Sequence, residues 1–326
     1  MISKNKYEVF KELLEYFPIH IADILSKIPT RAVFNASEIR LRAGRPLGLT
    51  VSGESLFCSV SGTLCHLNQQ GLYIVTTEDI NYTFRTMCES SVYAYKEQIR
   101  SGYITLKNGC RAGLAASAVF ENGEISGFRT ISSINVRIAS EYRGCALPIS
   151  QFLNKGILIA GPPASGKTTL LRDAVRLVSN GALTDRKRVT VVDSRGEIAA
   201  VNNGIPQNDI GPLTDVISGT GKVEGIEIAL RTLNPQVIAF DEIFSSNEAD
   251  EVIKCFFTGT EVFTTVHLSS VDEITKRSAA MRVLESGAIS RLCFISNVGA
   301  EPECYSVEFI NGKLQLNKEK QELSID

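Results

Sequence analysis

The chain has 326 residues, of which 44% are hydrophobic and 21% are charged, and this composition excludes a disordered polypeptide. Since a domain commonly contains roughly one to two hundred residues, the length predicts two domains. The 34 basic and 36 acidic side chains leave a formal charge of −2, so we expect no nucleic-acid partner.

The cysteines and the hydropathy pattern both predict a cytoplasmic protein. The eight cysteines include no C-x-x-C pair and the chain has only three histidines, which favours neither a zinc site nor a disulfide framework. Scattered thiols are typical of a reducing compartment. No apolar run approaches the roughly 18 residues that would cross a bilayer.

Residues 1–146 are predicted to form an α+β domain with leading helices. Apolar residues recur at helical spacing over residues 9–28, interrupted by Pro18, and indicate a pair of helices. From Glu38 onward, apolar and polar residues alternate on both sides of a break at residues 44–46. This pattern predicts two short strands that turn back on each other.

The rest of this domain is expected to contain hairpins and one or two helices. Asn108-Gly109 and Asn122-Gly123 each supply the positive φ that a tight turn between antiparallel strands needs. A helical segment is predicted to begin at Thr77-Glu78-Asp79. A linker is expected over residues 144–154, followed by a second domain over residues 147–326.

The second domain opens with a phosphate-binding loop. Residues 157–159 indicate a short strand, GPPASGKT follows as a loop, and apolar residues over 170–178 indicate a helix that ends by Gly181. Backbone amides in such a loop surround a β-phosphate, and Lys167 reaches the β/γ oxygens. The predicted nucleotide-binding residues are Gly161, Pro162, Pro163, Ala164, Ser165, Gly166, Lys167, Thr168 and Thr169.

Three further predicted strands each end in a polar residue. They cover residues 188–192, 237–240 and 262–266, and they are followed by Asp193, Asp241 and His267. Open parallel sheets bind their ligands at the carboxyl ends of the strands, so we expect these residues near the nucleotide. Thr168 and Asp241 are the predicted ligands of Mg²⁺.

Hydrolysis of ATP also requires a carboxylate that orients the attacking water. Glu197 and Glu242 are the two candidates for this role. Asp193 and Glu197 stand four residues apart just beyond a predicted strand, where either could face the γ-phosphate. We expect His267 to contact the γ-phosphate or the catalytic water.

The order of four motifs resembles the secretion-ATPase superfamily that drives type II and type IV secretion. The segments GPPASGKTTLL, VTVVDSRGEI, ALRTLNPQVIAFDEI and FTTVHLSS stand where that superfamily has its Walker A motif, Asp box, Walker B motif and His box. More narrowly, EIRLRAGRP and FRTISSINVRIASEYRG, together with the ATPase half, resemble the stage III sporulation protein AA family over nearly the whole chain.

The resemblance implies an α/β protein, with a RecA-like P-loop ATPase core of the AAA type on a mainly parallel twisted sheet. A smaller, PAS-like α+β domain would precede this core. ATP and Mg²⁺ are the implied cofactors, and the implied assembly is a homo-hexamer with ATP at or near subunit boundaries. The implied role is a motor in the mother-cell cytoplasm of a sporulating bacterium, which energises a channel complex of membrane proteins.

The resemblance also assigns roles to individual residues. Glu197 matches the Asp-box base, Glu242 the Walker B glutamate, and Arg231 the arginine before the Walker B strand; Lys167, Thr168 and His267 match the Walker A pair and the His-box histidine. The charge-neutralising arginines of the family come from late strands of the N-terminal domain, where this chain has Arg129, Arg137 and Arg143.

The chain departs from the superfamily pattern at two motifs. No arginine follows the Walker B strand, because Phe244 stands after Ile243. The Asp box reads Val192-Asp193-Ser194 and places its glutamate one residue further on. Both Glu197 and Glu242 therefore stay open as the base.

Two other functions fit part of the sequence. Residues 217–221 resemble the signature of ABC-type transport cassettes, although Thr220 stands where that signature has glycine. The other possibility is a non-catalytic scaffold, which binds ATP to set its oligomeric state. Slow turnover together with nucleotide-dependent assembly would be typical of such a scaffold.

Overall fold

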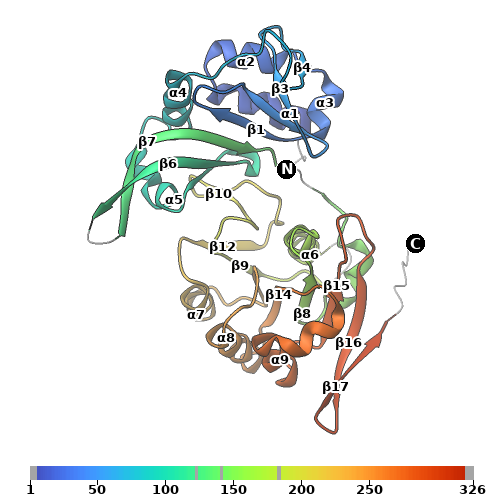
Figure 1. Ribbon diagram of the computed structural model, residues 1–326. Coiled ribbons are helices and arrows are strands. Elements are labelled where there is room, and N and C mark those ends of the chain that lie inside the picture. The colour runs from blue at the N-terminus through green and yellow to red at the C-terminus, as the bar shows by residue number, and fades with distance from the viewer. Residues whose placement is uncertain (1–5, 122–123, 140–141, 182–184, 320–326) are drawn as a thin grey trace. The chain divides into compact units, whose positions relative to one another are not determined.

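A computed structural model describes residues 6–121, 124–139, 142–181 and 185–319 (Figure 1). The chain divides into two compact units, residues 1–140 and 141–326. Each unit has a hydrophobic core of its own. Within the described residues, none of the helices has both the length and the hydropathy of a membrane span.

The N-terminal unit is an α+β domain with one antiparallel sheet. Its strands are β1 (Ala36–Arg42), β2 (Gly48–Val51), β3 (Glu54–Cys58), β4 (Leu64–Cys65), β5 (Tyr103–Thr105), β6 (Arg111–Glu121) and β7 (Glu124–Arg137). They are hydrogen-bonded in the order β4-β3-β2-β1-β7-β6-β5. The helices are α1 (Lys6–Leu13), α2 (Ile19–Ser26), α3 (Thr30–Asn35), α4 (Thr77–Met87) and α5 (Lys96–Arg100), with 3₁₀ turns η1 (Leu14–Tyr16), η2 (Val92–Tyr95) and η3 (Lys107–Gly109).

The sequence patterns of this unit are confirmed where the structure describes them. The predicted helical pair is α1 and α2, and β1 pairs antiparallel with β2. Asn108 has φ +58° in the turn from β5 to β6. A capping box of Thr76 and Asp79 precedes α4. The predicted turn at 122–123 lies outside the described residues.

The C-terminal unit is an α/β domain built on a mainly parallel sheet. Its main strands are β8 (Ile157–Gly161), β9 (Val189–Asp193), β12 (Thr214–Ser218), β13 (Val237–Phe240), β14 (Glu261–His267), β15 (Arg291–Phe294), β16 (Glu303–Ile310) and β17 (Lys313–Lys318). Two short strands, β10 (Val201–Asn202) and β11 (Ile205–Pro206), pair separately. The helices are α6 (Lys167–Asn180), α7 (Lys222–Thr232), α8 (Ser246–Phe257) and α9 (Ser278–Glu285), with 3₁₀ turns η4 (Leu147–Phe152) and η5 (Val271–Lys276).

The order of the strands places β8 among parallel neighbours. The sheet runs β12-β9-β13-β14-β8-β15-β16-β17, and every pair from β12 to β15 is parallel. Only β16 and β17 continue it antiparallel. The carboxyl ends of β9, β13, β14 and β8 therefore lie along one edge of the sheet, as the sequence predicts.

Helices cover both faces of this sheet (Figure 1). All five residues of β8 are buried, and successive residues belong to opposite sides. Ile157 and Ile159 pack in the cluster that contains the apolar face of α6, whereas Leu158 and Ala160 pack with α7, α8 and α9. A strand that is buried on both faces has a continuous apolar sequence, which explains why these strands are recognisable from their residues.

The expectation of a linker over residues 144–154 is wrong. Residues 147–152 form η4, and Ile149, Phe152 and Leu153 are almost fully buried in the same cluster as α6. The carboxylate of Asp173 in α6 also accepts the amide of Ala146 at 2.8 Å. Pro148 stands in the first turn of η4. Composition alone does not distinguish such a packed 3₁₀ turn from a flexible connection.

The structure joins two cysteines that the sequence does not indicate as a pair. Cys293 of β15 and Cys304 of β16 lie opposite each other and form a disulfide. Their Cα atoms are 4.3 Å apart, which is the spacing of a non-hydrogen-bonded pair across antiparallel strands. The register of the two strands brings these thiols together, and spacing along the chain does not indicate this single pair.

Candidate functional site

The phosphate-binding loop connects β8 to α6. A Cβ on Gly161 would collide with the carbonyl oxygen of Ile295, and Gly166 has φ +101°, a left-handed value that side chains disfavour. The backbone thus requires glycine at both positions. Because α6 begins at Lys167, the amides of its first turn have no carbonyl partner within the helix, and they can bind an anion.

Lys167 is buried beside this loop, with 6% of its surface exposed. Its Nζ donates to the carbonyl oxygen of Pro162 at 2.7 Å and lies 3.0 Å from Nδ1 of His267. Burial lowers the pKa of Lys167, and the charges of Asp241 and Glu242 oppose this shift. A buried ammonium whose closest partners are neutral is well suited to a phosphate oxygen.

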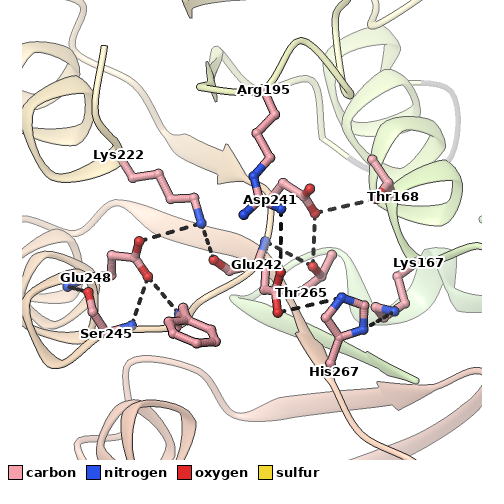
Figure 2. Close-up of polar contacts among 11 residues, drawn as sticks. Lys167, Thr168, Arg195, Lys222, Asp241, Glu242, Ser245, Glu248, Thr265 and His267 are labelled. Carbon is pink, nitrogen blue, oxygen red and sulfur yellow. Dashed lines mark hydrogen bonds and ion pairs between the residues drawn. The ribbon is translucent and has the colours of Figure 1, made fainter. Parts of the chain in front are cut away.

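His267 lies at the end of β14, between Lys167 and Glu242 (Figure 2). An ammonium can only donate, so Nδ1 of His267 accepts from Lys167 and the neutral ring carries its proton on Nε2. Nε2 is 3.6 Å from Oε1 of Glu242, and 38% of the side chain is exposed. The ring can therefore donate to a bound ligand or to water at this edge of the sheet.

Asp241 follows β13 and accepts hydrogen bonds from two hydroxyl groups. Its Oδ1 is 3.1 Å from Oγ1 of Thr265 and 3.4 Å from Oγ1 of Thr168 (Figure 2). A carboxylate beside the loop threonine fits Mg²⁺, which takes few protein oxygens and completes its shell with phosphates and water. Accordingly, no group of three or more His, Cys, Asp or Glu side chains that could hold a metal exists among the described residues.

Glu242 has a left-handed backbone, with φ +39°, which is uncommon for a residue other than glycine. Its amide donates to Oγ1 of Thr265 at 3.0 Å. Thr265 is 1% exposed. Its hydroxyl holds both acids in place, because it donates to the Asp241 carboxylate and accepts from the Glu242 amide. The Glu242 carboxylate lies 3.8 Å from Nη1 of Arg195.

An open cavity of about 520 Å³, part of which is continuous with solvent, adjoins Glu242 and His267. Its other lining residues include Phe244, Lys276 and Arg277. The cavity leaves room for a ligand or for water beside the carboxylate and the imidazole. The site therefore combines a loop for phosphate, an acid and hydroxyl pair for Mg²⁺, and a carboxylate with access to water.

Comparison with known proteins identifies the family. The family model described as sporulation stage III, protein AA, matches residues 11–310. The chain belongs to this family. Stage III sporulation protein AA of Bacillus subtilis (strain 168) is 33% identical to it over 290 residues, which are 87% of this chain and 90% of that protein.

Solved structures show that this member of the protein AA family shares its fold with a pilus retraction motor and with an ATPase. The pilus retraction motor PilT with bound ADP has a TM-score of 0.56 and 15% identity, over 90% of this chain and 82% of that chain. The DotB ATPase of Yersinia pseudotuberculosis has a TM-score of 0.50 and 17% identity, over 87% and 74% of the two chains. At these identities the likeness concerns the fold, which has a RecA-like core.

Asp193 does not face the candidate site, although it ends β9 at the predicted edge. The carboxylate is 3% exposed and turns back into the loop that follows the strand. There it accepts the amides of Glu197 at 2.9 Å, Ile198 at 3.2 Å, Ala199 at 2.8 Å and Ala200 at 3.2 Å. Asp193 is thus a structural centre for residues 194–200, which carry Arg195 and Glu197.

Glu197 lies within this loop. Its amide donates to Asp193, and its carbonyl oxygen accepts from Arg172 at 2.7 Å. These are contacts of the backbone, and they fix the path of the chain at Glu197. The assignment of its side chain as the base, which the Asp-box motif suggests, stays a prediction.

The arginines singled out in the sequence lie on different elements. Arg129 and Arg137 belong to β7 of the N-terminal unit, whereas Arg143 of the C-terminal unit pairs with Asp209 at 2.9 Å. Arg231 is exposed in the last turn of α7. Any contribution of these four arginines to a nucleotide site stays a prediction.

Sequence reasoning misses three residues that the structure places around the acids, namely Thr265, Arg195 and Lys222. Thr265 appears in the sequence as one of several interior residues of a predicted strand. Arg195 stands inside the motif VVDSRGEI, in which the sequence predicts roles only for the two acids. Lys222 donates to the carbonyl oxygen of Glu242 from the start of α7. Spacing along the chain does not indicate that any of these three residues contacts the acids.

The role of Asp193 can be tested with Asp193→Asn. An asparagine has one acceptor oxygen and an NH₂ group that would face backbone donors, so we expect a loss of about 1.5–3 kcal/mol in the free energy of unfolding. Urea denaturation measures this loss, and amide exchange should accelerate at residues 197–200. The exposed Asp215→Asn is the control. Unchanged stability with lost nucleotide binding would instead place Asp193 at the ligand.

Proposed function

We propose that the chain is an ATP-hydrolysing motor of the secretion-ATPase type. The observation that carries the proposal is the convergence of Lys167, Thr168, Asp241, Glu242 and His267 at one edge of the parallel sheet (Figure 2). These five residues come from three separate predicted motifs. Their proximity supports a single site for a nucleoside triphosphate and its metal.

Each of these residues has a distinct task in the proposed reaction. Lys167 and the first-turn amides of α6 bind the phosphate oxygens. Thr168 and Asp241 would hold Mg²⁺, which when bound neutralises charge on the phosphates. His267 would donate from Nε2 to the γ-phosphate or to the attacking water. Such a reaction depends on positioning and charge neutralisation rather than on covalent chemistry of the protein.

We assign the orientation of the attacking water to Glu242. Its carboxylate is 16% exposed, adjoins the open cavity and lies 3.6 Å from His267, which itself contacts Lys167. Glu197 is the second candidate, because the Asp-box motif of the family points to it. The position of the Glu242 carboxylate beside the open cavity and His267 favours Glu242.

The finer assignments follow from the family and are part of the proposal. The active form is a homo-hexamer in which a neighbouring subunit supplies a charge-neutralising arginine, with Arg129, Arg137 and Arg143 as candidates. The motor works in the cytoplasm of a sporulating cell and acts on a membrane channel complex. The likeness to PilT covers 90% of this chain, including the N-terminal unit, and this favours a secretion-type motor over an ABC-type cassette.

Lys167→Ala tests the nucleotide site. We expect no measurable ATP turnover and at least a tenfold weaker ATP affinity, because the buried ammonium that meets the phosphates is lost. Phosphate release and binding of a fluorescent ATP analogue measure the two quantities. Lys155→Ala, at an exposed lysine just before β8, is the control and should retain both. Normal turnover in Lys167→Ala would refute the site.

Glu242→Gln and Glu197→Gln, measured side by side, test the choice of base. Glu242→Gln should bind ATP normally and hydrolyse it about 10²- to 10⁴-fold more slowly, since an amide cannot accept the proton of water. Glu197→Gln should change turnover by less than about tenfold. The reverse order of the two variants would make Glu197 the base.

The assembly can be tested without any substitution. Particle mass with and without ATP, and turnover per subunit across protein concentrations, are measured in the same samples. We expect turnover per subunit to rise as the assembly forms, because an arginine supplied by a neighbour contributes about 10³- to 10⁵-fold in rate. A constant rate per subunit would contradict shared catalysis. Slow turnover even in the assembled state would indicate a scaffold.

A further inference from the structure

The left-handed backbone at Glu242 is held in place from both sides. With φ +39°, this residue adopts a conformation that costs free energy for any side chain with a Cβ. Such a conformation persists only where the surrounding contacts enforce it. On the amide side, the contact is the hydrogen bond to the hydroxyl of Thr265 at 3.0 Å.

The contact on the carbonyl side is made by Lys222. Its Nζ donates to the carbonyl oxygen of Glu242 and lies 3.5 Å from Oε1 of Glu248 (Figure 2). The Lys222 side chain is only 11% exposed. A buried ammonium needs partners for its donors, and here one carbonyl and one carboxylate provide them.

Glu248, the second partner of Lys222, is itself held in place by hydrogen bonds. The Oε2 atom of Glu248 accepts the amides of Phe244 at 2.7 Å and Ser245 at 3.1 Å, as part of the capping box of α8. Its other oxygen faces Lys222. The segment that directly follows Glu242 is therefore tied to the same ammonium through the start of α8.

The position of Lys222 along its helix also requires an explanation. Lys222 is the first residue of α7, where the helix dipole disfavours a cation, and Gly221 provides no side-chain cap. Packing of α7 alone does not call for a charged residue at this end. The contacts to Glu242 and Glu248 account for a lysine at this position.

We propose that Lys222 is a positioning residue for Glu242. It fixes the peptide after Glu242 in the left-handed conformation, and this turns the carboxylate toward His267 and Arg195. The inference rests on the proposed function, in which Glu242 orients the attacking water. Lys222 touches neither substrate nor water in this scheme and acts only through Glu242.

The same contacts are also compatible with a purely structural role, in which Lys222 only joins α7 to α8. The two roles differ in what they predict for the reaction. A structural anchor that is removed lowers stability and affects every step of turnover, whether or not Glu242 carries its carboxylate. A positioning residue that is removed lowers kcat, and the loss disappears when Glu242 can no longer serve as the base.

Lys222→Met removes the donors and keeps most of the apolar part of the side chain. We expect kcat to fall about 10- to 100-fold, since misplacement of a catalytic group by an ångström has effects of this order. ATP affinity should stay within about twofold. The matched control is Lys254→Met, whose lysine is 56% exposed and forms an ion pair within α8 at 2.5 Å; kcat should stay within about twofold.

The decisive comparison adds Lys222→Met to Glu242→Gln. The residual rate of Glu242→Gln should change by less than about twofold, because both variants remove the same function. A further loss of about tenfold in this background would overturn the inference. Lys222→Gln is a second variant: it keeps a polar group but is one bond too short for both oxygens, and it should show the same loss of kcat.

A crystal structure of Lys222→Met tests the inference independently of activity. We expect Glu242 to leave the left-handed region and its carboxylate to move away from His267. Retention of the positive φ and of the carboxylate position would overturn the inference. If the unsubstituted protein binds ATP without hydrolysing it, the proposed function fails, and this structure still decides whether Lys222 holds Glu242.

Discussion

The site depends on the register of three parallel strands, β13, β14 and β8. Phe240 lies opposite Thr264, and His267 lies opposite Gly161. The acids that follow Phe240 are therefore beside Thr265, while the imidazole is beside the start of the phosphate-binding loop. A slip of one residue would turn Thr265 to the other face of the sheet and separate the hydroxyl from both acids.

This register also separates the ammonium of Lys167 from the carboxylate of Asp241. The closest partners of Lys167 are a carbonyl oxygen and an imidazole nitrogen, whereas Asp241 is held by hydroxyl groups. A direct ion pair between Lys167 and Asp241 would let each neutralise the other. With the charges separated, the ammonium suits phosphate oxygens and the carboxylate suits a divalent cation, so a nucleotide with its metal satisfies both.

Much of the fold and of the site follows from short continuous segments. The strands β8, β13 and β14 are apolar throughout because both faces of the sheet are covered, and the polar residue after each is therefore conspicuous. The loop is recognisable because glycines are required at fixed positions on either side of it. The packed 3₁₀ turn at residues 147–152 and the pairing of Cys293 with Cys304 are not predictable in this way, since each depends on distant strands and helices.

The sequence by itself determined the loop of the phosphate-binding type, the acids and the histidine at the strand ends, and the division into an α+β and an α/β part. Only the tertiary structure decided which of these side chains meet. It turned Asp193 into its own loop, placed Thr265 between two acids and brought Lys222 to the backbone of Glu242. The physical reason is that periodicity along a chain reports burial, whereas the partner of a polar group is set by strand register and by the packing of helices.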